Sequence, residues 1–276
     1  MTPPVRRSSL IALLLLPALA ACGHVPLSAS ELHTVARPAF VARIELDAGP
    51  RSTVFRDLSS QASRLQGLAP AEGDRRLAAK LAQGATPFEV AERLRIGVVR
   101  RLPETTPWTY AVPASEVSGV LQSLLVEEQP QRRPDVRQLE RLGADTLIEL
   151  VVERYGMQGE GGAPGIYVSG RARMTRLNSG ATYYARSFSY RMPSSAELPL
   201  DPLVIAREPR RFGEALSRLL DQAAAQIAQD LQPGGHSGRD AQRAGTPPSL
   251  DDEADSLPRD AGSRPTELPG DALPAP

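Results

Sequence analysis

The sequence predicts an α+β fold in which amphipathic helices pack on one face of a mainly antiparallel sheet. Alternating residues predict three consecutive strands over residues 144–155, 166–177 and 181–192, the last two joined by the turn Asn178-Ser179-Gly180. The run 210–231 then places its apolar residues along one helical stripe. Such a stripe has to be buried, and the sheet formed by the three strands is the surface available to it.

The earlier part of the chain adds a strand and several helices. Alternation predicts a strand over residues 40–46, and apolar spacing predicts helices over residues 53–65, 74–83 and 87–94. The apolar centre of residues 95–102 predicts a second strand.

Two further helices are predicted after a Pro-rich loop. Ser115 is placed to cap the first, and Asp135 the second, which ends at Gly143 because glycine readily adopts the left-handed conformation there. The apolar face of the first helix consists of Val117, Val120, Leu121, Leu124 and Leu125. In the loop, Trp108 and Tyr110 form an exposed contact surface, or Trp108 anchors the loop in the core.

The last strand is rich in tyrosine, and its alternation divides the side chains between two faces. One face carries Tyr184, Arg186, Phe188, Tyr190 and Met192. Tyr183, Tyr184 and Tyr190 are candidates for an aromatic binding face, although alternation assigns half of the strand to the core.

The N-terminal residues form an export signal that ends at the single cysteine of the chain. Arg6 and Arg7 precede an apolar run that is too short to span a bilayer comfortably. Leu19-Ala20-Ala21-Cys22 resembles the lipobox of bacterial lipoproteins. This resemblance implies removal of residues 1–21 as a signal peptide and acylation of the Cys22 sulfur and its new amino group. The alternative is an ordinary secretory peptide with an incidental cysteine.

The same resemblance indicates where the protein resides and how the chain is divided. Gly23 replaces the Asp that commonly retains Gram-negative lipoproteins in the inner membrane, which implies an outer-membrane anchor and a body that faces the periplasm. Residues 22–38 are then the lipidated N-terminus and tether, and residues 39–232 an α+β periplasmic domain. Residues 233–276, rich in Pro, Gly and Asp, are predicted to be a disordered tail.

A weaker resemblance concerns residues 95–231. Gly143-Ala144-Asp145 opens a strand that is followed by a meander with a glycine turn and by a closing helix. This layout resembles periplasmic lipoproteins of the curli-secretion and penicillin-binding-protein-activator type, and the N-terminal domain of the TolB family. The chain lacks the Val-x-x-Phe strand motif of those families, so no functional residue is carried over from them.

Composition and residue placement argue against several functions. The 32 basic residues equal the 32 acidic residues, which leaves no electrostatic case for nucleic acid binding. His24, His33 and His236 lie in the predicted tether and tail, away from any nucleophile held by the core. One cysteine and three histidines exclude zinc sites of the usual spacing. We therefore predict no catalytic residue, no cofactor and no metal site.

Three carboxylates offer the only alternative to this prediction. Asp145, Glu149 and Glu153 share a strand face, and a pair of carboxylates could act as acid and base in the hydrolysis of a glycan such as peptidoglycan. The structural interpretation is that they pair across the sheet with Arg171 and Arg173.

The functional prediction follows from the anchor and from the missing catalytic set. We expect a lipid-anchored cell-envelope protein that acts non-enzymatically as an adaptor, assembly factor or regulator. Its partners are the membrane, through acylated Cys22, and an unidentified envelope protein. The alternative is an envelope hydrolase.

The glycines of residues 159–165 lack the Lys-Ser/Thr of a phosphate-binding loop, so we predict a flexible hairpin connection there.

Overall fold

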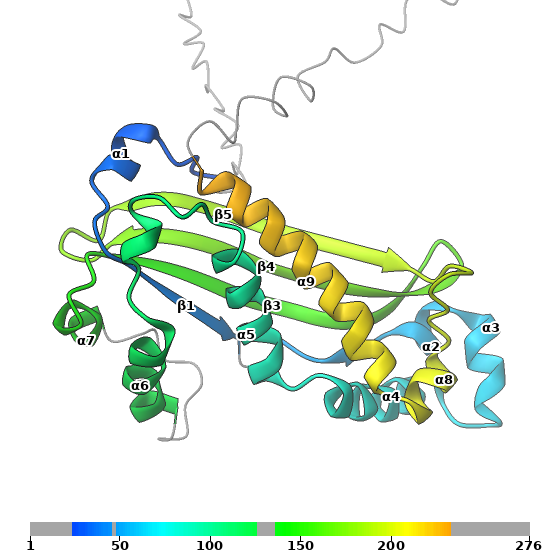
Figure 1. Ribbon diagram of the computed structural model, residues 1–276. Helices are drawn as coiled ribbons and strands as arrows, with labels where there is room; N and C mark the ends of the chain where they lie inside the picture. Colours follow the sequence, from blue (N-terminus) through cyan, green and yellow to red (C-terminus); the bar gives the residue numbers. More distant parts are fainter. Residues whose placement is uncertain (1–23, 46–47, 126–135, 233–276) are drawn as a thin grey trace, which may run out of the picture. The chain divides into compact units, whose positions relative to one another are not determined.

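A mostly antiparallel sheet carries the fold of the computed structural model (Figure 1). The residues that the structure describes are 24–45, 48–125 and 136–232. Within them, only the backbone is described for residues 120–125 and 136. Cys22, Asp135 and the predicted tail, residues 233–276, lie outside the described residues. The predicted α+β class is confirmed.

The strands are arranged in the order β1-β3-β4-β5, and β2 also pairs with β3. Their bounds are Pro38–Ile44 for β1, Arg51–Ser52 for β2, Thr146–Glu160 for β3, Ala163–Arg176 for β4 and Thr182–Pro193 for β5. β1 and β2 run parallel to β3, whereas β3, β4 and β5 form an antiparallel meander. A parallel pair needs a long crossover, and the helices between β2 and β3 supply it.

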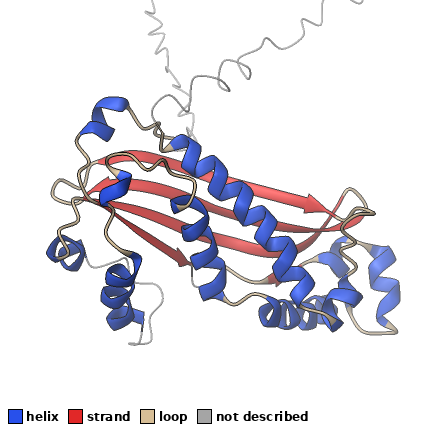
Figure 2. Ribbon diagram, viewed as in Figure 1, coloured by secondary structure: helices blue, strands red, loops and turns tan. Residues whose placement is uncertain are grey.

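Helices α5 and α9 lie across one face of the sheet (Figures 1 and 2). The helices are α1 Ala29–His33, α2 Val54–Asp57, α3 Ser59–Ala62, α4 Pro70–Gly84, α5 Pro87–Val99, α6 Ala114–Leu125, α7 Val136–Arg141, α8 Pro202–Arg207 and α9 Arg210–Asp230, with short 3-10 helices at Ser63–Leu65 and Trp108–Tyr110. The stripe predicted for α9 is buried throughout, at Phe212, Leu216, Leu219, Leu220, Ala223 and Ile227. Apolar burial on this scale is what holds the helix on the sheet.

The predicted strand over residues 95–102 is wrong, because α5 continues through it to Val99. The helix is set at its start, where the hydroxyl of Thr86 accepts a hydrogen bond from the backbone N–H of Glu89. Val90, Leu94 and Val98, spaced by four residues, then form its buried face. Taken alone, the β-branched residues near the end of α5 favour a strand. Together with the four-residue spacing of the buried face, they continue the helix.

The glycine-rich segment between residues 156 and 165 is strand for most of its length and not a flexible loop. Only Gly161 and Gly162 form the turn between β3 and β4. At Gly156 the backbone of β2 approaches closely, since a Cβ would lie 1.9 Å from the carbonyl oxygen of Arg51. Gly156 therefore allows two backbones to pack closely, a requirement that alternation and turn rules do not detect.

Other predicted elements differ mainly in their ends. The single helix over residues 53–65 is wrong, because Leu58 is extended, with φ −122° and ψ 102°, and separates α2 from α3. Ser115 lies within the first turn of α6 and does not cap it. Gly143 follows α7 with φ +78°, as predicted for a helix C-terminus.

Helices α6 and α7 cover part of the second face of the sheet, which the one-face prediction did not include. Alternation along β1 turns Phe40 towards the main core and Val41 towards this second cluster. Val117 of α6 and Leu139 of α7 are buried in the same cluster as Val41.

The predicted tether is shorter in the structure, because residues from Val25 onward dock on the body. Val25 forms a β-bridge with Ala185 of β5. Leu27, Leu32 and Val35 are buried in the main core. The helix α1 between them is capped by Ser28, whose side chain accepts from the backbone N–H of Glu31. Sparse apolar residues thus order a segment whose overall composition resembles that of a linker.

Tyr155 and Tyr184 are both fully buried, but only one of their hydroxyls has a partner. Tyr184 Oη donates to Asp230 Oδ2 at 3.1 Å, whereas Tyr155 Oη has no hydrogen-bond partner within the part of the chain that the structure describes. Burial raises the pKa of Tyr155 to about 12. Burial is also the main cause that raises the pKa of Tyr184. Both rings therefore stay neutral at physiological pH.

The two tyrosines give a matched test of the core. Tyr155→Phe is expected to leave the free energy of unfolding unchanged or slightly higher, because it removes a buried hydroxyl without a partner. Tyr184→Phe is expected to cost about 1–2 kcal/mol, because Asp230 loses a donor. Urea denaturation followed by circular dichroism measures both, and an equal cost for the two substitutions would contradict this assignment.

Candidate functional site

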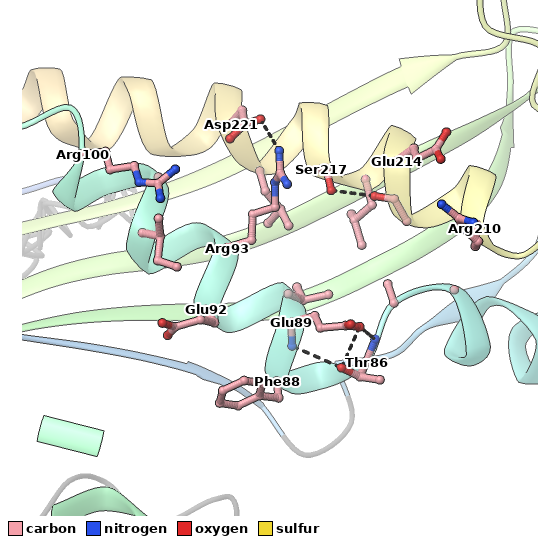
Figure 3. Close-up of a pocket in the computed structure, with 18 of the residues that line it drawn as sticks. Thr86, Phe88, Glu89, Glu92, Arg93, Arg100, Arg210, Glu214, Ser217 and Asp221 are labelled. Atoms are coloured by element: carbon pink, nitrogen blue, oxygen red, sulfur yellow. Dashed lines mark hydrogen bonds and ion pairs between the residues drawn. The ribbon is translucent and has the colours of Figure 1, made fainter. Parts of the chain in front are cut away.

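An open groove of about 980 Å³ lies between α5 and α9 (Figure 3). Close contacts position the two helices. A Cβ at Gly213 of α9 would lie 2.2 Å from the carbonyl oxygen of Gly84, at the end of α4. A Cβ at Gly97 of α5 would lie 2.8 Å from the Cβ of Ala224 on α9. Small residues thus let the backbones approach, and longer side chains line the open side.

Arginine side chains from α5 and the residues after it meet a single carboxylate of α9. Asp221 accepts from Arg93 at 2.9 Å, and a nitrogen of Arg101 lies 3.8 Å from its other oxygen. Arg100 and Arg210 also line the groove (Figure 3). All of these side chains are partly or largely exposed, so the pairs contribute little stability and remain accessible to a ligand.

The acidic residues on the α5 side of the groove are held as carboxylates. The backbone N–H and hydroxyl of Thr86 donate to Glu89, and these hydrogen bonds lower the pKa of Glu89. A hydrogen bond from Arg95 lowers the pKa of Glu92 in the same way. A general acid or base near pH 7 needs a pKa shifted in the opposite direction. The α5 side of the groove is therefore suited to binding by charge and shape.

Phe88 is the most exposed large apolar side chain among the residues described, with 71% of its surface accessible. It lines the groove and projects from the first turn of α5 (Figure 3). Exposed aromatic residues beside charged groups are typical of contact points in protein interfaces. This site was not predicted from the sequence, because the residues of α5 were divided between a predicted helix and a predicted strand. The signal that could have found it is Thr86-Pro87 with Glu89 as a capping box.

The strand carboxylates considered for hydrolysis are paired with arginines. Glu149 Oε1 accepts from Arg43 Nε at 2.7 Å. Glu153 pairs with Arg171, which also donates to Glu45 at 2.6 Å. The structural interpretation is therefore confirmed for Arg171.

The remaining members of that set lie elsewhere in hydrogen-bond networks. Asp145 accepts from Arg176 at 3.0 Å and from the backbone N–H groups of Ala36 and Arg37. Arg173, predicted as a partner of the carboxylates, donates to the hydroxyl of Thr182. A register shift of β3 between residues 152 and 154 also takes Glu153 out of simple alternation.

Other candidate residues are placed as follows. Trp108 is 8% exposed and packs against Phe40 with 6.2 Å between ring centroids, so it anchors the loop, whereas Tyr110 is 64% exposed. His24 and His33 are exposed, and His236 lies outside the described residues. Within residues 24–45, 48–125 and 136–232, no group of three His, Cys, Asp or Glu is placed to hold a metal ion.

No helix in the described part of the chain combines the length and the apolar character needed to cross a bilayer. The apolar run before Cys22 lies outside those residues.

Comparisons with known proteins give only distant similarities. No protein-family model matches the sequence, and no curated protein matches it. Among solved structures, the chain is similar to lipoprotein GNA1162 from Neisseria meningitidis, with 13% identity and a TM-score of 0.33 over 68% of this chain and 98% of that one. The PelC dodecamer from Paraburkholderia phytofirmans gives 10% identity and a TM-score of 0.29, covering 72% and 87%. The LpoB C-terminal domain from Salmonella enterica gives 11% identity and a TM-score of 0.27, over 56% of this chain and 82% of that one.

At these identities and TM-scores the similarities assign neither family nor activity. The layout resemblance that begins at Gly143-Ala144-Asp145 stays a prediction.

Proposed function

We propose that this chain is a lipid-anchored protein of the bacterial cell envelope that acts without catalysis, as an adaptor, assembly factor or regulator. Its body binds another envelope protein through the groove between α5 and α9. The observation that carries this proposal is the open groove itself, lined by accessible arginines and by exposed Phe88.

The form of the groove favours a protein segment over a small molecule. Sites for small ligands enclose most of the ligand surface and are mainly apolar. This groove is open to solvent, and its arginines reach across it to Asp221. A partner with carboxylates beside an apolar residue would satisfy both the arginines and Phe88.

The anchor rests on the N-terminal sequence. Acylation of Cys22 after removal of residues 1–21 would hold the protein at the membrane, since each buried CH₂ contributes about 0.8 kcal/mol and more than one chain gives stable anchoring. Gly23 directs the proposal to the outer membrane. The periplasmic body extends to residue 232, and residues 233–276 are proposed as a disordered tail.

The alternative, a glycan hydrolase, receives no support from the geometry. Glu149 and Glu153, its proposed acid and base, are each engaged by an arginine. Both carboxylates thus act as ion-pair acceptors within the sheet, which is the structural interpretation of this set.

Photo-crosslinking in intact cells tests the groove. A photoreactive residue at Phe88 or at Glu214, both of which line the groove, is expected to give the same discrete protein adduct. The same residue at Ser179, in the exposed turn between β4 and β5, is the control and should not give it.

A second substitution distinguishes binding in the groove from nonspecific hydrophobic association. With the photoreactive residue at Glu214, Phe88→Ser is expected to lower the adduct yield at least about tenfold, since an aromatic contact at the centre of an interface is worth about 2 kcal/mol or more. Tyr110→Ser removes another exposed aromatic, one that does not line the groove, and should leave the yield unchanged. An adduct at Ser179 of equal yield, or none at either groove position, would contradict the proposal.

A further inference from the structure

We propose that the β5 edge of the sheet, near Ala185, faces the lipid bilayer, and that the groove end formed by Gly84 and Arg210 faces away from it. This inference rests on the proposed acylation of Cys22. It adds a defined orientation of the body to that anchor.

The starting observation is that the chain is fixed to the body almost immediately after Cys22. Val25 N–H donates to the carbonyl oxygen of Ala185 at 2.8 Å, and Ala185 N–H donates back to Val25 at 2.9 Å. Val25 therefore forms an isolated antiparallel β-bridge on the outer edge of β5.

The residues that follow Val25 also contact the body, so the segment is fixed at more than one point. Leu27 and Leu32 are buried in the main core. Arg176 donates to the carbonyl oxygen of Thr34 at 2.6 Å, which ties the end of α1 to β4. The segment is thus held on both sides of α1.

Chain length then limits how far the body can move from the membrane. Val25 lies three positions after Cys22, and an extended chain spans at most about 3.3–3.6 Å per residue, or about 10–11 Å over these three steps. Ala185 lies one strand spacing further, about 5 Å. If the acyl chains of Cys22 are in the bilayer, the β5 edge lies within about 16 Å of the interface.

The opposite edge of the sheet, formed by β1 and β2, is the part furthest from that point in strand order. α4 contacts β2 and the start of α9, so Gly84 and Arg210 belong to this distant side. α9 has 21 residues and is therefore about 30 Å long. The C-terminal end of α9 lies at the anchored edge, because Asp230 accepts hydrogen bonds from Tyr184 and Arg186, the two neighbours of Ala185. α9 thus leads from the anchored edge to the distant end of the groove.

Fluorescence quenching on vesicles tests this orientation. Cys22 is the single cysteine of the chain, so after acylation an introduced cysteine is the one free thiol for a fluorophore. The full-length lipidated chain, labelled at Ser187→Cys or at Lys80→Cys, is reconstituted in phosphatidylethanolamine–phosphatidylglycerol vesicles that contain nitroxide-headgroup lipid. Ser187 is exposed on β5 and Lys80 is exposed on α4.

The label at position 187 is expected to lose about half of its fluorescence or more, because the short connection holds it near the headgroups. The label at position 80 should lose little. A Gly/Ser insertion of about 20 residues between Gly23 and His24, which spans about 25 Å as a random coil, should reduce quenching at position 187 to the level at position 80.

The outcomes distinguish the two proposals. Vesicle binding with equal quenching at both positions, or quenching at 187 that survives the insertion, overturns the orientation and leaves the anchor intact. Failure of the full-length chain to carry acyl groups or to bind vesicles overturns both.

Discussion

A chain that lacks Cys22 is released from the membrane fraction. The variant replaces residues 1–22 with a cleavable secretory signal that has no cysteine, so that the mature protein begins at Gly23. The proposed anchor consists of the acyl chains on Cys22, so their loss is expected to remove the membrane attachment. Fractionation of cells followed by a wash in concentrated salt should recover the variant almost entirely as soluble protein.

The control for this experiment is the same secretory signal with its cleavage region replaced by Leu19-Ala20-Ala21-Cys22, so that the signal ends in the lipobox. This chain should return to the membrane fraction and resist the salt wash. Retention of the Cys22-free variant after the wash would instead locate the membrane affinity in the body, and would contradict the lipid anchor as the cause.

Loss of Asp74 is expected to destabilise the fold strongly. This carboxylate is 3% exposed and accepts from Ser52 Oγ at 2.6 Å, from the backbone N–H of Phe55 at 3.1 Å and from Arg56. It joins α4 to the start of α2 by satisfying two buried donors, the Ser52 hydroxyl and the Phe55 N–H. Asp74→Ala leaves at least two of these donors without a partner, so the free energy of unfolding should fall by about 2–4 kcal/mol.

Urea denaturation measures this loss, with Arg56→Ala as the matched control. The side chain of Arg56 is 55% exposed, so its ion pair with Asp74 contributes only about 0–1 kcal/mol. Asp74→Asn keeps an acceptor oxygen and should fall between the two. A loss no larger for Asp74→Ala than for Arg56→Ala would contradict the role of Asp74 as a buried acceptor.

The fold was largely predictable where one strong pattern decides a segment. The meander of β3, β4 and β5 follows from alternation and from the turn at Gly180, and α9 follows from its stripe. The strand predicted over residues 95–102 failed because Ile96, Val98 and Val99 are β-branched, while the capping box at Thr86 sets a helix that continues through them. The β-branched composition of this segment favours a strand, whereas the apolar spacing over the whole of α5 favours a helix. Packing of that apolar face against the sheet stabilises the helix.

The groove could not be predicted from the sequence because it requires α5 and α9 to meet, and these helices are separated by more than a hundred residues. The close approach of α5 to α9 depends on Gly97, and Gly213 lets α9 approach the end of α4. In a sequence both resemble any other helix glycine. Arg171 was predicted as a partner of the strand carboxylates, and it pairs with Glu153 at the bulge of β3, where the regular register is interrupted.

The docked N-terminal segment was also beyond the sequence patterns. Val25, Leu27 and Leu32 are too widely spaced to indicate an amphipathic element, and Pro26 adds to the appearance of a linker. Each of them finds a specific place on the body, which only tertiary contacts provide. In the orientation that we propose, this docking holds the β5 edge close to the acylated Cys22.

The lipid anchor is tested most directly by the mass of the N-terminal peptide from the mature protein, purified from the cell envelope. This peptide is expected to begin at Cys22 and to carry acyl groups on both the sulfur and the amino nitrogen. An N-terminus at another residue, or a Cys22 that retains a free thiol, would contradict the lipid anchor.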